Sequence, residues 1–391
     1  MDIKRYVKMI KCQFNYIKFR YLDLTIKVGS CNKNDIIWLK EFLCPYLKPT
    51  DSSFCDCEIH LILDDKYFNS LLQKSPQSKI KISGFILDKK IVKLITWESS
   101  KNCQILFDDE FNVFYLVSHE KKQVTVLAHH TKSIGFRTAL MRVITEYAMN
   151  YSRTHGGFFI HSSAFAYNGK GIMIAGPENC GKTSLLIYFL QNLPSRFISN
   201  DRVLVFFDEA SPVIYGMPTV ITVSEDSLQM FPLLKINLLR YNFHHRYTID
   251  EILERKCRPY TLEQGEYTFS ARQFSHLLET RSSSDSQLSA ILFPHISKQS
   301  GSMSLESLPS AAVLERLEEA RFAKRLTEWQ SFFYLNPNHD SSPGVSGYEE
   351  FAYKVANQIP CFDCYLGFRN YEGNEAQQVI RKVFKEGLEK F

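Results

Sequence analysis

A glycine-bounded loop between a buried strand and an apolar helix constrains the fold of this chain most strongly. Residues 171–175 (GIMIA) predict the strand, and residues 184–193 predict the helix. The loop between them fits G-x-x-x-x-G-K-[ST] without a mismatch; its residues are Gly176, Pro177, Glu178, Asn179, Cys180, Gly181, Lys182 and Thr183. Backbone N–H groups of such a loop converge on phosphate, and the following helix directs the positive end of its dipole there. The sequence therefore predicts a polyphosphate-binding strand–loop–helix unit.

The residue types of the loop match the chemistry of a bound polyphosphate. Gly176 and Gly181 permit a backbone path that a Cβ atom would obstruct. Lys182 supplies a mobile cation for the β- and γ-phosphates, and Thr183 supplies a hydroxyl for Mg²⁺. The alternative is an ordinary strand-to-helix loop with an exposed lysine, which the apolar strand and helix on either side disfavour.

Polar residues on both sides of this unit are candidates for the same site. His161 lies fifteen residues before Gly176, across Asn168-Gly169, which is a strong hairpin signal. Asp201 precedes an apolar strand predicted at residues 203–207, from where its carboxylate can reach Mg²⁺ or a substrate hydroxyl above the loop lysine. A hydrogen-bonded structural histidine and a strand-end cap are the alternatives for these two residues.

Residues 155–207 resemble the catalytic core of the HPr kinase/phosphorylase family, whose P-loop architecture is related to that of phosphoenolpyruvate carboxykinase. The shared pattern is a histidine on one hairpin strand, a P-loop on the next turn, and an Asp-Asp pair before an apolar strand. The likeness continues weakly through residues 216–219 and toward residues 359–360, and residues 1–150 carry none. Relatives in this family include kinases that modify small peptides.

The resemblance implies a role for each of these residues. Residues 176–184, which end with Ser184, would bind the phosphates of ATP, and Thr183 and Asp201 would hold Mg²⁺. His161, Lys182 and Asp201 would form the catalytic set, with Glu225 as a further acidic candidate.

Asn200 stands where the family has its catalytic base, and an asparagine cannot accept a proton from a serine hydroxyl. Asp201 or His161 then takes that role, or transfer depends on positioning and charge alone, or the chain is not a kinase.

The leading functional hypothesis is therefore an ATP-dependent kinase that phosphorylates a serine hydroxyl of a protein or peptide. A kinase for a sugar or amino-acid hydroxyl is one alternative, and an open groove rather than a closed pocket near the loop would argue against it. A nucleotide-gated binding protein is the other, in which Asn200 has abolished catalysis and ATP orders residues 336–347. The sequence identifies neither the phosphate donor, ATP or another, nor whether the protein forms a homo-oligomer.

Chain length and hydrophobic periodicity predict two regions in a mixed α/β fold. The 391 residues fit one large domain or two ordinary ones. Residues 1–150 are expected to form a smaller, strand-rich domain for substrate recognition, to which a peptide could add a strand. Residues 151–391 are expected to form the P-loop kinase domain. The first region shows alternation at 22–28, 57–63 and 124–128, with helical spacing at 36–43 and 133–153.

The second region is predicted to alternate strands and helices. Strands are expected at residues 158–166, 195–199 and 203–207, and helices at 311–329 and 375–386, the last ended by Gly387. Residues 281–286 and 336–347 are predicted to be surface loops.

Composition excludes several classes of protein. Lys+Arg 47 and Asp+Glu 42 give a net charge of +5 spread along the chain, which does not predict a nucleic-acid partner. No apolar stretch is long enough for a transmembrane helix, and lysines interrupt the N-terminal apolar positions, so neither a membrane partner nor a secretory signal is expected.

The cysteine and histidine pairs predict no metal or redox site. Ten cysteines are too few for a disulfide scaffold, so free thiols in the cytoplasm are expected. Cys361 and Cys364 are expected to be strand or loop residues. The histidine pairs 129–130 and 244–245 are expected to be surface or packing residues.

Overall fold

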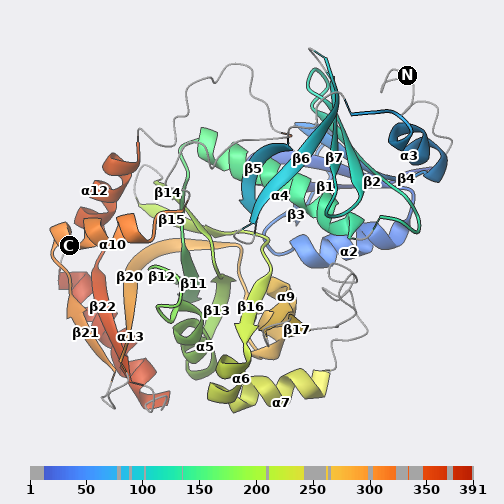
Figure 1. Ribbon diagram of the computed structural model, residues 1–391. Helices are drawn as coiled ribbons and strands as arrows, with labels where there is room; N and C mark the ends of the chain where they lie inside the picture. Colours follow the sequence, from blue (N-terminus) through green and yellow to red (C-terminus); the bar gives the residue numbers. More distant parts are fainter. Residues whose placement is uncertain are drawn as a thin grey trace.

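The computed structural model is a mixed α/β protein with two large mixed sheets (Figure 1). It describes residues 13–76, 81–87, 90–100, 103–133, 135–207, 211–241, 261–262, 266–297, 303–322, 333, 347–367 and 373–389.

The first region forms a nine-stranded sheet in the order β3-β1-β2-β4-β9-β8-β7-β6-β5. Its strands are β1 (Asn15–Tyr21), β2 (Leu24–Ser30), β3 (Lys48–Pro49), β4 (Cys57–Leu63), β5 (Lys81–Leu87), β6 (Lys90–Ser99), β7 (Cys103–Asp108), β8 (Val113–Ser118) and β9 (Gln123–Ala128). The helices are α2 (Lys33–Leu43), α3 (Asp65–Leu72) and α4 (Phe136–Thr154). The strand predicted from Leu22 begins two residues later, because Leu22 adopts a left-handed conformation (φ 53°) in the turn between β1 and β2.

The second region forms a ten-stranded sheet, in which β10-β14-β15-β20-β12-β11-β13-β19 are neighbours and β22 joins β20 to β21. Its strands are β10 (Phe158–Ile160), β11 (Ser162–Tyr167), β12 (Lys170–Ala175), β13 (Ser195–Ser199), β14 (Val203–Phe207), β15 (Pro212–Gly216), β19 (Arg281–Ser282), β20 (Asp285–Ser297), β21 (Ser304–Ser307) and β22 (Cys361–Gly367). A small third sheet contains β16 (Ile221–Ser224), β17 (Thr261–Leu262) and β18 (Glu266–Phe269).

Helices cover both faces of the ten-stranded sheet. They are α5 (Lys182–Asn192), α6 (Glu225–Met230), α7 (Pro232–Tyr241), α9 (Ala271–Leu277), α10 (Ser310–Glu319), α12 (Tyr348–Gln358) and α13 (Gly373–Glu389). Buried residues of α5, α9 and α13 belong to one hydrophobic cluster, and those of α10 and α12 belong to another. No helix in the described ranges combines the length and the apolar run that a membrane span requires.

The hairpin predicted at Asn168-Gly169 is confirmed. Tyr167 pairs with Lys170, and both turn residues have positive φ (51° and 78°), as a two-residue type I′ turn requires. The predicted strand 158–166, in contrast, is interrupted at His161. Its first part, β10, pairs with β14, whereas β11 pairs with β12 and β13.

Several predicted boundaries in the second region are wrong. The helix predicted over 311–329 ends at Glu319, because the chain then turns and Arg321 pairs with Ile160. Gly387 does not end the last helix, since α13 continues to Glu389. In the predicted surface loop 281–286, residues 281–282 form β19 and residues 285–286 begin β20, because they gain backbone partners on neighbouring strands. Of the loop predicted at 336–347, residues 336–346 lie outside the described residues, and Gly347 precedes α12. The histidine pair 244–245 also lies outside the described residues.

The prediction of free thiols is wrong for one described cysteine. Cys31 is disulfide-bonded. Its bonding depends on the three-dimensional course of the chain, which cysteine spacing does not reveal. Cys361 and Cys364 are buried free thiols on β22, where they pack within the two hydrophobic clusters.

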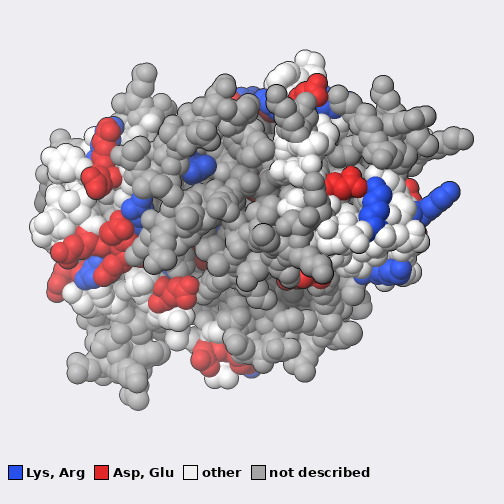
Figure 2. Space-filling view, turned by 45° about the horizontal axis from the view of Figure 1, so that its top comes forward, with Lys and Arg blue, Asp and Glu red and all other residues white. Residues whose placement is uncertain are grey.

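Charged side chains of both signs are mixed on the surface. On the face in Figure 2, one group of acidic side chains lies on the side where α10 and α12 lie in Figure 1, with arginine or lysine side chains among them, and further acidic side chains lie elsewhere on the face. The described lysines and arginines on this face form no single continuous basic area.

The two regions share one hydrophobic core. The largest cluster of buried residues contains side chains from both large sheets and from α4, which has thirteen buried residues. The hydroxyl of Tyr21 donates to Met217 Sδ at 2.8 Å, and the ring of Tyr46 packs against Gly216. The N-terminal sheet is therefore packed directly against the sheet that carries the loop.

Replacing Gly216 by alanine is expected to destabilise the protein through this contact. The added Cβ would overlap the Tyr46 ring and come within 2.5 Å of the carbonyl oxygen of Ile198. Overpacking of this kind costs about 1–3 kcal/mol. Urea unfolding should show that loss for Gly216→Ala and less than about 0.5 kcal/mol for the exposed control Tyr353→Ala. Equal stability of the two variants would contradict the close packing of Tyr46 against Gly216.

Candidate nucleotide-binding site

The strand order brings three chain segments together at one edge of the ten-stranded sheet, where its central strands β11, β12 and β13 begin or end. Strand β11 lies between β12 and β13 and is antiparallel to both, with Ser162 opposite Ala175 and Ala164 opposite Ser199. The beginning of β11 therefore lies beside the ends of β12 and β13. His161, the loop after β12 and the residues after β13 meet at this edge.

The loop after β12 has the backbone conformation that its glycines predict. Gly176, Asn179 and Gly181 have φ values of 153°, 59° and 96°, a region that L-residues other than asparagine and aspartate rarely adopt. A Cβ atom on Gly176 would also lie 2.8 Å from the sulfur of Cys180. Residues 177–179 are exposed at the top of the loop, and Ser184 is half-buried in the first turn of α5. A loop of this type lets successive N–H groups face one concavity.

Lys182 points back into the loop from the first turn of α5. Its side chain is buried, and Nζ donates to the carbonyl oxygens of Gly176 at 2.9 Å and Pro177 at 2.5 Å. These carbonyl groups are neutral acceptors, and phosphate oxygens bind an ammonium group more strongly. The cation is therefore already positioned where a phosphate group on the loop would meet it.

Asn200 connects the loop to β11 through its side chain. Its amide oxygen accepts hydrogen bonds from Ser163 Oγ at 2.6 Å and from Thr183 Oγ1 at 3.2 Å. Its backbone oxygen accepts from Thr219 Oγ1 at 3.2 Å. The residue at the end of β13 that contacts Thr183 is thus Asn200. Ser163 was not among the predicted site residues, although a serine in an otherwise apolar strand was a signal for it.

Asp201 lies between His161 and Arg202. Its carboxylate oxygens are 3.3 Å from His161 Nε2 and 3.2 Å from Arg202 Nε. The side chain of Asp201 is 32% exposed, whereas that of Arg202 is 2% exposed and its guanidinium lies 4.7 Å from the centre of the Phe322 ring. Asp201 has a left-handed backbone (φ 75°), a conformation that aspartate adopts more readily than most residues. Arg202 was not among the predicted site residues, although a charged residue directly before an apolar strand was a signal for it.

Opposing effects set the pKa of Asp201. Burial alone raises its pKa, but the hydrogen bond with His161 and the charges of Arg202, His161 and Lys182 outweigh burial and lower it below the ordinary 3.8. Asp201 is therefore ionised at neutral pH. In the loop itself, burial raises the pKa of the Cys180 thiol despite the nearby Lys182, which keeps this cysteine protonated and a poor nucleophile.

The donor atoms at this edge fit a magnesium ion shared with phosphate. Thr183 offers a hydroxyl, Asn200 an amide oxygen and Asp201 a carboxylate, all oxygen ligands of the kind that Mg²⁺ prefers. Within the described residues, no group of three or more His, Cys, Asp or Glu side chains could hold a metal by itself. Mg²⁺ commonly binds to one or two carboxylates together with substrate phosphates and water, so such a group is not required. Glu225, the further acidic candidate, begins α6 and forms its ion pair with Lys235 at 3.4 Å.

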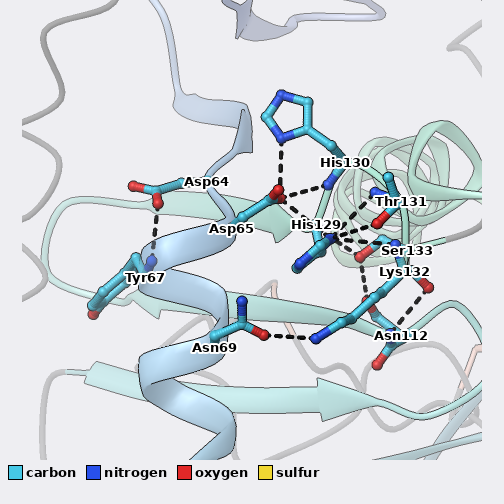
Figure 3. Close-up of polar contacts among 10 residues, drawn as sticks. All are labelled: Asp64, Asp65, Tyr67, Asn69, Asn112, His129, His130, Thr131, Lys132 and Ser133. Atoms are coloured by element: carbon cyan, nitrogen blue, oxygen red, sulfur yellow. Dashed lines mark hydrogen bonds and ion pairs between the residues drawn. The ribbon is translucent and has the colours of Figure 1, made fainter.

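A second polar cluster, at the beginning of α3, has a structural role (Figure 3). Asp65 Oδ1 accepts from the backbone N–H of His130 at 2.7 Å and lies 3.0 Å from its ring Nδ1. His129 is buried, and its Nδ1 accepts from the backbone N–H groups of Thr131 and Lys132 at 3.2 and 3.3 Å. The cluster joins the end of β9 to α3, with His129 packed inside and His130 at the surface.

No protein-family model matches the sequence, and no curated protein matches it.

The ion pairs of Asp201 predict a specific pH dependence of stability. Because the folded-state pKa is lowered, their stabilisation is complete above the unfolded value near 3.8 and is lost as the pH falls through the lower folded value. Asp201→Asn cannot titrate. The free energy of unfolding of the wild type relative to Asp201→Asn should therefore be larger at pH 6 than at pH 3, as measured by urea unfolding. A difference that is constant or grows in acid would contradict the lowered pKa.

Proposed function

We propose that this chain is a kinase with a P-loop core of the HPr kinase/phosphoenolpyruvate carboxykinase type, which transfers the γ-phosphate of ATP to a serine hydroxyl of a protein or peptide. One observation carries the proposal. The loop with its inward-pointing Lys182, the Thr183–Asn200 pair and the Asp201 carboxylate all lie at the same edge of one sheet. Cation, oxygen ligands and an ionised acid beside a phosphate-binding loop are the parts that phosphoryl transfer needs.

In this proposal the loop and the start of α5 bind the phosphates of ATP. Lys182 exchanges the carbonyl oxygens of Gly176 and Pro177 for phosphate oxygens and stabilises charge as the γ-phosphate leaves. Thr183 and Asp201, with Asn200 beside them, would hold Mg²⁺, which neutralises charge on the β- and γ-phosphates when bound. The helix dipole of α5 adds to this attraction.

Asp201 is the group best placed to accept the proton of the acceptor hydroxyl. It is ionised and partly exposed, and His161 and Arg202 fix its two oxygens. Its lowered pKa makes it a weak base, which is sufficient because phosphoryl transfer has a loose transition state and depends chiefly on positioning and charge. Asn200 can only orient Thr183 and Ser163, since an amide does not take up a proton at neutral pH.

The N-terminal sheet supports a peptide as acceptor. Its order ends with β5, and a sheet edge can add an extended peptide through backbone hydrogen bonds. A sugar or amino-acid hydroxyl remains the alternative acceptor, and assays with both kinds of acceptor distinguish them.

Lys182→Ala is expected to lower the rate of phosphoryl transfer strongly. The protein is incubated with ATP, Mg²⁺ and serine-containing peptides or small hydroxyl compounds, and mass spectrometry detects a product heavier by one phosphate. Loss of a single charge-stabilising donor lowers kcat by about 10²–10³-fold. Lys170→Ala, an exposed lysine at the opposite end of β12, is the matched control and should retain the rate. Full activity of Lys182→Ala would show that this loop is not the site.

A second candidate function is a nucleotide-gated binding protein without catalysis. The observation that favours it is Asn200, whose amide oxygen is already used by two hydroxyl groups at the place where a base would act. Such a protein would bind ATP and Mg²⁺ at the same loop, and no acceptor would gain a phosphate.

Asn200→Asp separates the two functions. An aspartate keeps acceptor oxygens for Ser163 and Thr183, so the fold should be retained, and it restores a carboxylate beside the loop. If the wild type is a binding protein, calorimetry should detect nucleotide binding by both forms, and transfer should appear only in the variant. If the wild type is a kinase, it phosphorylates an acceptor before any substitution is made.

A further inference from the structure

A hollow of about 470 Å³ lies at the end of α5 opposite to the loop. Three of its lining side chains, Leu190, Leu193 and Leu278, are buried, and Leu233 of α7 is 49% exposed. The volume is within the range of small-molecule sites. The leucines form the apolar part of its lining, and the polar part, which is larger, includes Gln191, Thr280 and two arginines. The elements around it, α5, β13, α7 and α9, lie together in the lower half of Figure 1.

Two arginines at this hollow stand side by side. β13 and β19 are parallel, and Arg196 is in register with Arg281, so their side chains leave the same face of the sheet on adjacent strands. Both residues are exposed and line the hollow. Like charges placed directly opposite each other on neighbouring strands are destabilising unless an anion lies between them. Within the described part of the chain, neither arginine forms an ion pair with a carboxylate.

The other charges near the hollow do not cancel this pair. Glu279 also lines it, but its Oε1 is 3.6 Å from Arg240 Nη1, so Arg240 balances its charge. The C-terminal end of α5 contributes about half a negative charge at most. An excess of more than one positive charge therefore faces a hollow that four leucines help to line.

We infer that this hollow binds a small amphipathic anion, with an apolar body against the leucines and a carboxylate or phosphate head on Arg196 and Arg281. Arginine side chains bind both kinds of head through paired N–H···O contacts. α5 has eleven residues, which places this hollow about 16 Å from the loop. The inference is independent of the proposed kinase activity, because none of the loop residues lines the hollow.

Calorimetry on the full chain tests the charge of the ligand. Octanoate and octyl phosphate are the anionic probes, and octanamide is the neutral analogue of the same length. Saturable 1:1 binding of at least one anion is expected, with a Kd at least about tenfold lower than that of octanamide. Which anion binds more tightly identifies the head group. Equal binding of octanamide, or no saturable binding of either anion, would overturn the inference.

Matched variants test the position of the site. Arg196→Ala and Arg281→Ala should each raise the Kd of the anion at least about tenfold, whereas Arg272→Ala, an exposed arginine on α9 that pairs with Glu41, should leave it unchanged. For the apolar wall, Leu233→Asn should weaken binding, and Ile236→Asn, exposed on the same helix but absent from the lining, should not.

Thermal unfolding establishes that each variant is folded. If the two control variants weaken binding as much as the test variants, the anion binds elsewhere and the assignment is wrong.

Discussion

The antiparallel placement of β11 between β12 and β13 is the constraint on which the candidate site depends. The hydrogen-bonded register of these three strands fixes the start of one beside the ends of the other two. His161, the loop that starts at Gly176, and Asn200 lie just outside these strands, and Ser163 lies inside β11, where it bonds to Asn200. The site is thus a consequence of strand pairing, which places the side chains of these segments close enough to contact one another.

The shared core links the N-terminal sheet to this edge. Tyr46, which follows α2, is buried against Gly216 and hydrogen-bonds with Ser199, the residue before Asn200. Burial raises the pKa of Tyr46 well above its usual value, so its hydroxyl stays neutral. The first region therefore supports the backbone from which Asn200 projects, in addition to any contact that it makes with a partner.

The local elements of the site were predictable from the sequence, and their long-range contacts were not. The hairpin at Asn168-Gly169, the strand before the loop and the helix after it follow from turn chemistry and apolar runs within a few residues. The break at His161 was not visible, because residues 158–166 are uniformly compatible with a strand. The break depends on Ala320, whose carbonyl accepts the N–H of His161 at 2.8 Å from more than 150 residues away. The bond from Thr183 to Asn200 and the burial of Arg202 likewise depend on the fold.

The left-handed backbone at Asp201 limits which residues this position can accommodate. Aspartate, asparagine and glycine adopt this conformation at little cost, whereas β-branched residues do so only with strain. Of these three, aspartate alone has a negative charge for His161 and Arg202. The backbone and the two partners together therefore leave aspartate as the one residue of the three that suits both, because asparagine and glycine would remove the charge.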